Sequence, residues 1–174
     1  MIRTPNLVLI GFMGVGKSSV GRKCAQKLGY PYHDTDQWIV RHVHKPIPQI
    51  FSEDGEAAFR ELEREAVRLL AMRSAIVLST GGGAVLDPEN ATMLRESGVV
   101  VLLTASTESI MERVGGRTNR PLLQCEDPQA RVTELLAMRE PVYRSVAHAV
   151  VDTSSRDLDE VAREVLSHYR SRSA

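Results

Sequence analysis

Short runs of apolar, often β-branched residues alternate along this chain with longer stretches in which apolar residues recur every three or four positions. The runs are typical of buried strands, and the longer stretches are typical of amphipathic helices. We predict strands at residues 7–10, 30–33, 75–79, 99–103 and 149–151, helices between them, and a closing helix at 157–169. Alternation of this kind indicates a parallel sheet that helices cover on both faces. The sequence therefore predicts a three-layer α/β/α fold with a five-stranded parallel sheet.

Local signals refine this prediction. Asp87 and Asp127 each stand directly before a proline, so each carboxylate is expected to cap a helix whose first residue is that proline. Two segments, 34–61 and 115–126, interrupt the alternation of strands and helices. Insertions on an α/β core usually form the substrate site and its lid. We expect a single domain over residues 1–174 that carries both.

The strongest local motif lies at residues 11–18, which read GFMGVGKS and fit the P-loop pattern G-x-x-x-x-G-K-S/T. It follows the first predicted strand and opens a helical stretch at 17–28. Its glycines let successive N–H groups face phosphate oxygens, Lys17 adds a charge at the β- and γ-phosphates, and the Ser18 hydroxyl is suited to bind magnesium. A plain tight turn is the alternative, but the full context favours binding of ATP or GTP. The expected nucleotide-binding residues here are Gly14, Val15, Gly16, Lys17, Ser18 and Ser19.

Composition and charge argue against several classes of protein. The 174 residues include 22 basic and 22 acidic side chains, and a net charge of zero argues against a general nucleic-acid or membrane-surface binder. No apolar stretch approaches a membrane-spanning length, and no leader pattern precedes Asn6. The two cysteines, Cys24 and Cys125, lack C-x-x-C spacing. We therefore expect a cytoplasmic protein with free thiols, and a monomer, since no exposed heptad or long apolar edge is evident.

Two carboxylates follow the second predicted strand, at Asp34 and Asp36. If the backbone is still extended there, both point to one face, and the carboxyl end of the strand directs them toward the P-loop. One would then serve the metal and the other a substrate hydroxyl. The alternative is a pair that caps a helix at 37–43. Because residues 75–80 offer only Ser79 and Thr80 to a metal, Asp34 is the best available carboxylate for magnesium.

Three consecutive glycines, at 81–83, follow the third predicted strand. They allow a ligand to approach the backbone closely and expose N–H donors, whereas a plain turn needs only one or two glycines.

Further on, Arg60 stands beside the apolar stripe of a predicted helix, with Glu56 four residues before it and Glu63 three after. This pattern alone favours a solvated ladder of ion pairs. The stripe consists of Phe59, Leu62, Ala66, Leu69 and Leu70.

Six motifs in order resemble shikimate kinase over essentially the whole chain. They are GFMGVGKS at 11–18, DTD at 34–36, the segment IF…DGE…FRELE at 50–63, TGGG at 80–83, RTNRPLL at 117–123 and REPVYR at 139–144. That family transfers the γ-phosphoryl group of ATP to the 3-hydroxyl of shikimate. The resemblance implies a fold similar to nucleoside monophosphate kinases, with a helical shikimate-binding segment at 34–61 and a mobile lid at 113–126.

The resemblance also implies roles for single residues. Asp34 matches the acid that acts on Mg²⁺ together with Ser18, and Asp36 matches the carboxylate that binds shikimate hydroxyls. Arg60 and Arg139 match the guanidinium groups that bind the shikimate carboxylate. The remaining matches are Gly82, whose N–H meets the same substrate, and Glu63, which would hold Arg60.

Further matches concern the phosphates and the base. Arg120 matches the lid arginine that closes over the phosphates, and Arg113 and Arg156 match positions near adenine. Lys17, Asp36 and Arg120 are thus the implied catalytic residues, with Mg²⁺ as the cofactor and ATP and shikimate as the partners.

Three residues depart from the family pattern, and three other interpretations of the chain stay open. Val40, His44 and Pro46 differ from residues common in the family and bear on the expected loop geometry and substrate affinity, not on the reaction. His42 and His44 form an H-x-H pair, but no other ligand cluster lies nearby to support a metal site. The rivals are a gluconate-type kinase, a GTPase, which lacks its N-K-x-D motif here, and a nucleotide-binding module without catalysis.

Overall fold

The computed structural model describes residues 4–114 and 126–173, and in this part of the chain five strands form one sheet in which every pairing is parallel. The strand order is β2-β3-β1-β4-β5. This confirms the predicted sheet, and each strand overlaps its predicted range. The strands are β1 Asn6–Ile10, β2 Tyr32–Asp34, β3 Val77–Ser79, β4 Gly98–Thr104 and β5 Ala149–Asp152.

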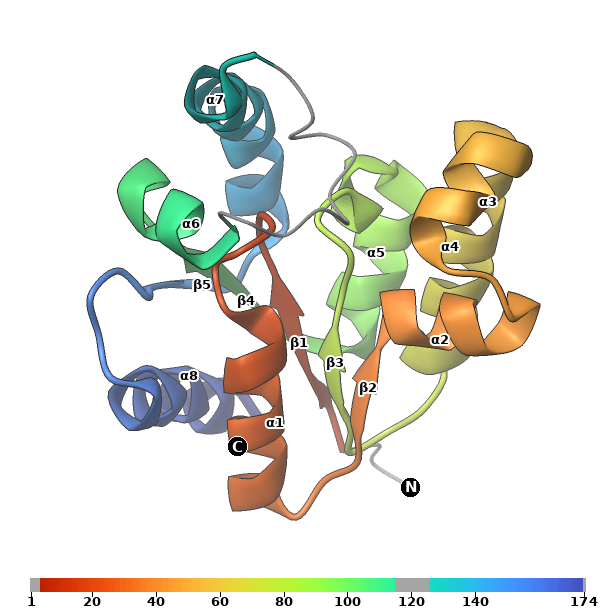
Figure 1. Ribbon diagram of the computed structural model, residues 1–174. Coiled ribbons are helices and arrows are strands. Elements are labelled where there is room, and N and C mark those ends of the chain that lie inside the picture. Colours follow the sequence, from red (N-terminus) through yellow and green to blue (C-terminus); the bar gives the residue numbers. More distant parts are fainter. Residues whose placement is uncertain (1–3, 115–125, 174) are drawn as a thin grey trace.

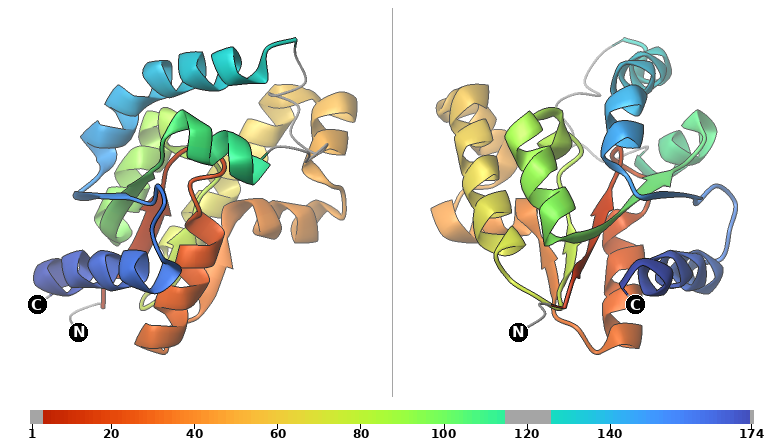
Figure 2. Two further views of the ribbon diagram at one scale, coloured as in Figure 1. Left: turned by 60° about the vertical axis from the view of Figure 1, so that its left-hand side comes forward. Right: turned by 180° about the vertical axis from the view of Figure 1, so that it is seen from behind.

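Helices cover both faces of the sheet (Figures 1 and 2), as predicted. α1 and α8 pack together on one face, and α4, α5 and α7 lie on the other. α2, α3 and the start of α4 fall within residues 34–61, the expected insertion, and they lie beside β2. The bounds are α1 Lys17–Leu28, α2 Thr35–Val43, α3 Ile47–Glu53, α4 Gly55–Ala71, the 3₁₀ turn η1 Ala84–Leu86, α5 Pro88–Ser97, α6 Thr107–Val114, α7 Pro128–Val146 and α8 Leu158–Ser173. Among the described helices, none has the length and apolar character to cross a membrane.

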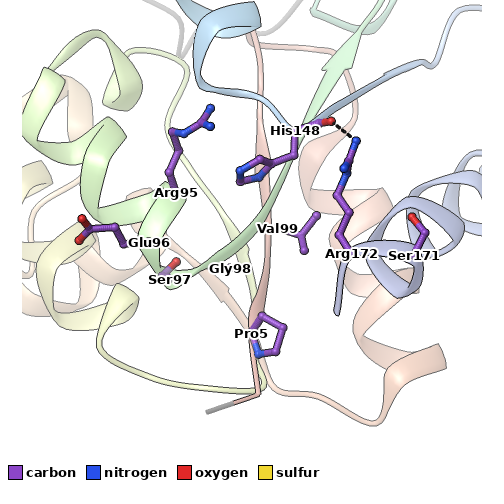
Figure 3. A pocket seen from close by; sticks show the side chains of 9 residues that line it. All are labelled: Pro5, Arg95, Glu96, Ser97, Gly98, Val99, His148, Ser171 and Arg172. Carbon is purple, nitrogen blue, oxygen red and sulfur yellow. Dashed lines mark hydrogen bonds between the residues drawn. The ribbon is translucent and has the colours of Figure 1, made fainter. Parts of the chain in front are cut away.

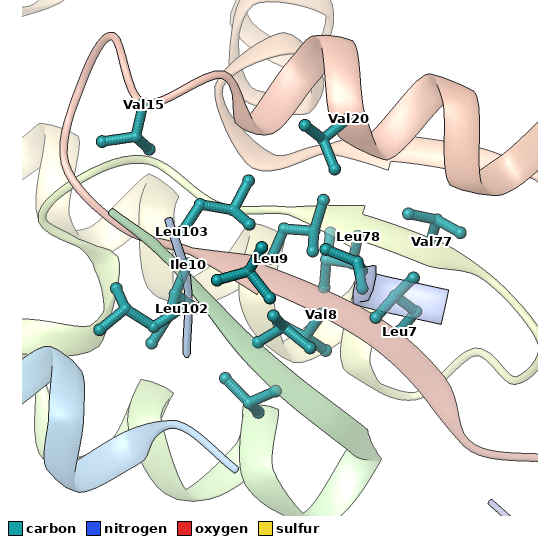
Figure 4. Packing of buried hydrophobic residues seen from close by; sticks show 14 of the residues in the cluster. Leu7, Val8, Leu9, Ile10, Val15, Val20, Val77, Leu78, Leu102 and Leu103 are labelled. Carbon is teal, nitrogen blue, oxygen red and sulfur yellow. The ribbon is translucent and has the colours of Figure 1, made fainter. Parts of the chain in front are cut away.

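The core surrounds β1, the central strand. Leu7, Val8, Leu9 and Ile10 are fully buried because both faces of the sheet are covered, which explains the continuous apolar run in the sequence. Figure 4 shows these side chains packed among those of β3 and β4 and against Val20 of α1. A second, smaller cluster lies under the insertion and consists of Ile39, Ile50, Phe59 and Ala66.

Two predicted helix starts are confirmed. The Asp87 carboxylate accepts a hydrogen bond from the N–H of Glu89 at 2.9 Å, and the Asp127 carboxylate accepts one from the N–H of Ala130 at 2.9 Å. Each helix has its proline in the first turn. Because all pairings are parallel, the carboxyl ends of the five strands lie on one side of the sheet, where the P-loop and the insertion begin (Figure 1).

Candidate active site

The P-loop joins β1 to α1 at the carboxyl ends of the strands. Gly11 has a φ of 139°, and an added Cβ would lie 2.4 Å from the carbonyl oxygen of Leu103, so no other residue fits there. The Lys17 ammonium folds back over the loop and donates to the carbonyl oxygens of Gly11 and Phe12, each at 2.7 Å. Gly16 precedes α1 and gives it no side-chain cap. The first turn of α1 therefore presents N–H groups and a positive dipole end to an anion.

Asp34 serves two elements at once. Its Oδ1 accepts from the N–H groups of Asp36 and Gln37 at 2.9 and 3.2 Å, which caps α2. Its Oδ2 accepts from the hydroxyl of Ser18 at 3.3 Å and from that of Tyr32 at 3.2 Å. The cap and the P-loop contact, treated as alternatives from the sequence, thus occur together. The premise of an extended backbone was wrong, because α2 begins at Thr35.

The first turn of α2 contacts the glycine loop that follows β3. The hydroxyl oxygen of Thr35, which is buried, accepts from the N–H of Gly81 at 2.9 Å. A Cβ added to Gly81 would lie 2.7 Å from Oδ1 of Asp36 and 3.0 Å from Oε1 of Glu63. The glycine at this position therefore lets two carboxylates lie directly against the backbone.

Arg60 lies beside the same loop. Its guanidinium donates to the carboxylate of Glu63 at 2.7 Å and to that of Glu56 at 3.1 Å. A Cβ added to Gly83 would lie 2.7 Å from Nη1 of Arg60. Both ion pairs suggested by the pattern are present, but the expectation that the ladder is solvated was wrong for Glu63, whose side chain is only 2% exposed. Burial raises the pKa of Glu63, and the neighbouring Arg60 opposes that rise.

The predicted stripe of this helix needs one correction as well. Leu69, assigned to the apolar face, is 37% exposed, while Glu63 occupies the buried face instead. Glu63 can be buried because the guanidinium of Arg60 gives its carboxylate a charged partner.

α7 closes the opposite side of the glycine loop. Arg139 lies over the ring of Phe12, with the guanidinium carbon 5.7 Å from the ring centre. One turn later, the buried Tyr143 donates a hydrogen bond from its hydroxyl to the carbonyl oxygen of Gly82. Sequence reasoning missed Tyr143. The available signal was its position four residues after Arg139, which puts both on one face of a helix.

The two arginines expected near adenine differ in their surroundings. Arg113 donates to the carbonyl oxygen of Gly14 at 3.2 Å and to the carbonyl oxygen of Thr153 at 2.7 Å. The buried Thr153 hydroxyl in turn contacts the carbonyl oxygen of Val15 at 2.8 Å. Arg156 lies further out, where it donates to the Asp152 carbonyl oxygen at 3.0 Å and pairs with a carboxylate of α8 at 2.8 Å. Thus Arg113 is joined to the P-loop, and Arg156 lies at the end of β5.

A model of the family described as shikimate kinase matches residues 13–170. The chain belongs to the shikimate kinase family. The shikimate kinase of Thioalkalivibrio sulfidiphilus is 42% identical over 170 residues, covering 98% of this chain and 90% of that protein. That of Dechloromonas aromatica is 47% identical over 164 residues, covering 94% and 90%.

The fold of this chain is similar to that of solved shikimate kinase structures. Shikimate kinase from Acinetobacter baumannii in complex with shikimate has a TM-score of 0.93 and 39% identity, and the match covers 97% of this chain and 94% of that one. A gluconokinase from Sinorhizobium meliloti has a TM-score of 0.60 and 21% identity over 98% of this chain and 94% of that one, so it shares the fold alone. The α/β P-loop kinase fold is confirmed.

Part of the expected shikimate kinase site lies outside the described residues. Arg120, and with it most of the segment 113–126, is among them. Within the described ranges no group of three or more His, Cys, Asp or Glu side chains forms a metal cluster. Magnesium in phosphoryl-transfer sites needs only one or two protein oxygens, because phosphates and water complete its shell. The hydroxyl of Ser18 and the carboxylate of Asp34, in contact at the start of α1, fit that requirement.

A separate hollow of about 590 Å³ lies at the amino ends of the strands, on the side of the sheet away from the P-loop (Figure 3). Arg95 donates there to the carbonyl oxygen of Val146 at 2.7 Å, and Arg172 donates to that of His148 at 2.8 Å. These guanidinium groups hold the connection between α7 and β5. The hollow is remote from the P-loop, so it is not part of the shikimate kinase site.

Proposed function

We propose that this protein is a shikimate kinase that transfers the γ-phosphoryl group of ATP to the 3-hydroxyl of shikimate, giving shikimate 3-phosphate and ADP. The observation that carries the proposal is the contact of Asp36 and Arg60 with one glycine loop beside the P-loop. A module that only binds nucleotide has no use for such an arrangement, whereas a kinase needs an acceptor site next to its phosphate site. The family match over residues 13–170 supports the same acceptor.

The acceptor site suits a small polyhydroxy acid. In our assignment the guanidinium groups of Arg60 and Arg139 bind the carboxylate of shikimate, because planar forks of N–H donors match its two oxygens. The N–H of Gly82 has no hydrogen-bond partner among the described residues and is the expected third donor. Asp36 binds the hydroxyl groups and orients the one that attacks. Glu63 holds Arg60 from the buried side.

The phosphate site suits a loose transition state, which demands alignment and neutralised charge more than strong base catalysis. We assign Lys17 and the N-terminus of α1 to the phosphates of ATP. Ser18 and Asp34 are the residues that would hold Mg²⁺, which when bound neutralises phosphate charge. Arg120 is assigned to the transferred group through the family resemblance. A closed lid would exclude water, which competes with the acceptor hydroxyl.

We further propose that the protein acts in the cytoplasm as a monomer and binds neither nucleic acid nor membranes. The support for the absence of nucleic-acid and membrane binding is the composition, in which 22 basic and 22 acidic residues leave no net charge to attract polyanions or anionic lipid.

The test is ADP release from ATP and magnesium with shikimate, beside reactions with gluconate and with nucleoside monophosphates. Turnover confined to shikimate supports the proposal, while turnover of gluconate alone, or of no acceptor, refutes it. Two variants on α4 localise the acceptor. Arg60→Ala is expected to raise the KM for shikimate about 10- to 100-fold, as loss of charge-assisted hydrogen bonds predicts. Arg64→Ala removes a guanidinium paired with Glu61 and Asp87 instead and is expected to leave that KM unchanged.

A further inference from the structure

The hydroxyl of Tyr143 links the two groups assigned to the acceptor carboxylate on opposite sides of the site. It donates to the carbonyl oxygen of Gly82, and the Tyr143 side chain is 2% exposed. Arg139 stands one turn earlier on the same face of α7. Burial raises the pKa of Tyr143, although the charge and a hydrogen bond of Arg139 oppose that rise. The phenol therefore stays protonated at neutral pH and remains a donor.

Gly82 needs such an anchor because it has no side chain to restrict its backbone angles. The residues on either side are held by other bonds. The N–H of Gly81 is bound to Thr35, its carbonyl oxygen accepts from Ala84 at 3.1 Å, and the carbonyl oxygen of Gly83 accepts from Leu86 at 3.1 Å. Between them, the carbonyl of Gly82 is held by Tyr143 alone among the described residues.

The P-loop closes this set of contacts. A Cβ added to Gly82 would lie 3.5 Å from the nitrogen of Met13 and 3.6 Å from the oxygen of Gly11. Arg139 in turn lies over Phe12 of the same loop. The glycine loop, the start of the P-loop and α7 thus contact one another pairwise, and the Tyr143 hydroxyl supplies the directional bond among them.

We propose that Tyr143 is a positioning residue for the acceptor. Its hydroxyl holds Gly82 from the carbonyl side, while the Gly81–Gly82 peptide that carries the Gly82 N–H is held through the Gly81 carbonyl, so that this N–H and the Arg139 guanidinium meet one carboxylate together. Tyr143 itself touches no substrate in this assignment. The inference rests on the proposed function, because it presupposes a carboxylate held by Gly82 and Arg139.

The experiment compares two phenylalanine variants that each remove one buried hydroxyl. Tyr143→Phe removes the bond to Gly82. Tyr169→Phe removes an equivalent bond, 2.8 Å long, to the carbonyl oxygen of Pro5, directly before β1 and away from the P-loop. Both tyrosines are almost fully buried, so similar losses in Tm are expected. Only Tyr143→Phe is expected to raise the KM for shikimate, by about three- to tenfold, with kcat and the KM for ATP nearly unchanged.

An analogue of shikimate with a hydroxymethyl group in place of the carboxylate gives the second readout. With this analogue, wild type and Tyr143→Phe are expected to have the same KM, because the positioned donors have no carboxylate to bind. Equal KM values for shikimate in the two phenylalanine variants would overturn the assignment of Tyr143 and leave the proposed function standing. Lack of shikimate-dependent ADP release by the unmodified chain would overturn the proposed function, and this assignment with it.

Discussion

Gly81 has no room for a side chain, because the carboxylates of Asp36 and Glu63 lie against it. An added Cβ would be 2.7 Å from Oδ1 of Asp36, whereas ordinary van der Waals contact begins at 3.4 Å. A Gly81→Ala methyl would therefore displace the Asp36 carboxylate by 3.4 − 2.7, or about 0.7 Å. The φ of Gly81 is outside the left-handed region, so the substitution adds this contact without backbone strain.

In our assignment Asp36 orients the acceptor hydroxyl, so a shift of its carboxylate changes the geometry of the reaction. The residue is fixed in the first turn of α2, where its N–H is bound to the Asp34 cap at 2.9 Å. Overpacking of this kind costs about 1–3 kcal/mol in the free energy of unfolding. Misplacement of a reacting group by about 1 Å costs about 100-fold in rate. We therefore expect Gly81→Ala to lower kcat about 10- to 100-fold.

Steady-state ADP release at saturating ATP and shikimate measures kcat, and urea unfolding measures stability. Gly29→Ala is the control, since Gly29 caps the far end of α1 with a φ of 69° and has no atom within 4 Å of an added Cβ. This variant is expected to lose about 1–2 kcal/mol in the free energy of unfolding through backbone strain and to keep the wild-type kcat. A Gly81→Ala enzyme with wild-type kcat would refute the argument that the position of Asp36 limits the rate.

Three further predictions concern other parts of the fold. Thr153→Val removes the hydroxyl in contact with the Val15 carbonyl, so we expect a higher KM for ATP and an unchanged KM for shikimate. The free energy of unfolding is expected to fall by about 1–3 kcal/mol. Unchanged ATP kinetics would contradict this. Burial and the charge of Arg95 hold the pKa of His148 below 6.5, so the unfolded chain binds this proton more readily and the contribution of His148 to stability is lost as pH falls below that value. Tm should therefore fall less on acidification in His148→Asn than in wild type, and parallel Tm curves would contradict it. Burial raises the pKa of the Cys24 thiol to about 12, so iodoacetamide at about pH 8 is expected to alkylate it only after unfolding, as peptide mass spectrometry would detect.

The sequence predicted the elements that depend on local pattern. The strand at 7–10 was recognisable because both its faces are buried, so every position is apolar. Asp87 and Asp127 were recognisable because a cap acts on N–H groups two or three residues away. The P-loop was recognisable because its glycines, Lys17 and Ser18 are contiguous and follow a strand.

Contacts between distant segments could not be predicted in this way. The Tyr143 hydroxyl meets a carbonyl 61 residues away, and the Thr153 hydroxyl meets one 138 residues away, so neither bond leaves a local spacing in the sequence. For Glu63 the pattern was misleading, because a charge next to an apolar stripe is usually solvated, and only the packed partners Arg60 and Gly81 reveal its burial.

These distant contacts share a physical logic. The loops that carry the site are rich in glycine because phosphate, carboxylates and guanidinium groups must approach their backbone closely, and that choice gives up the restraint that side chains provide. Buried hydroxyl groups restore the restraint from outside each loop. Tyr143 bonds to Gly82, Thr35 to Gly81, Ser79 to Lys17 at 3.2 Å, and Thr153 to Val15. Loss of such a hydroxyl should therefore weaken the binding of one substrate selectively, according to the loop it holds, in addition to its cost in stability.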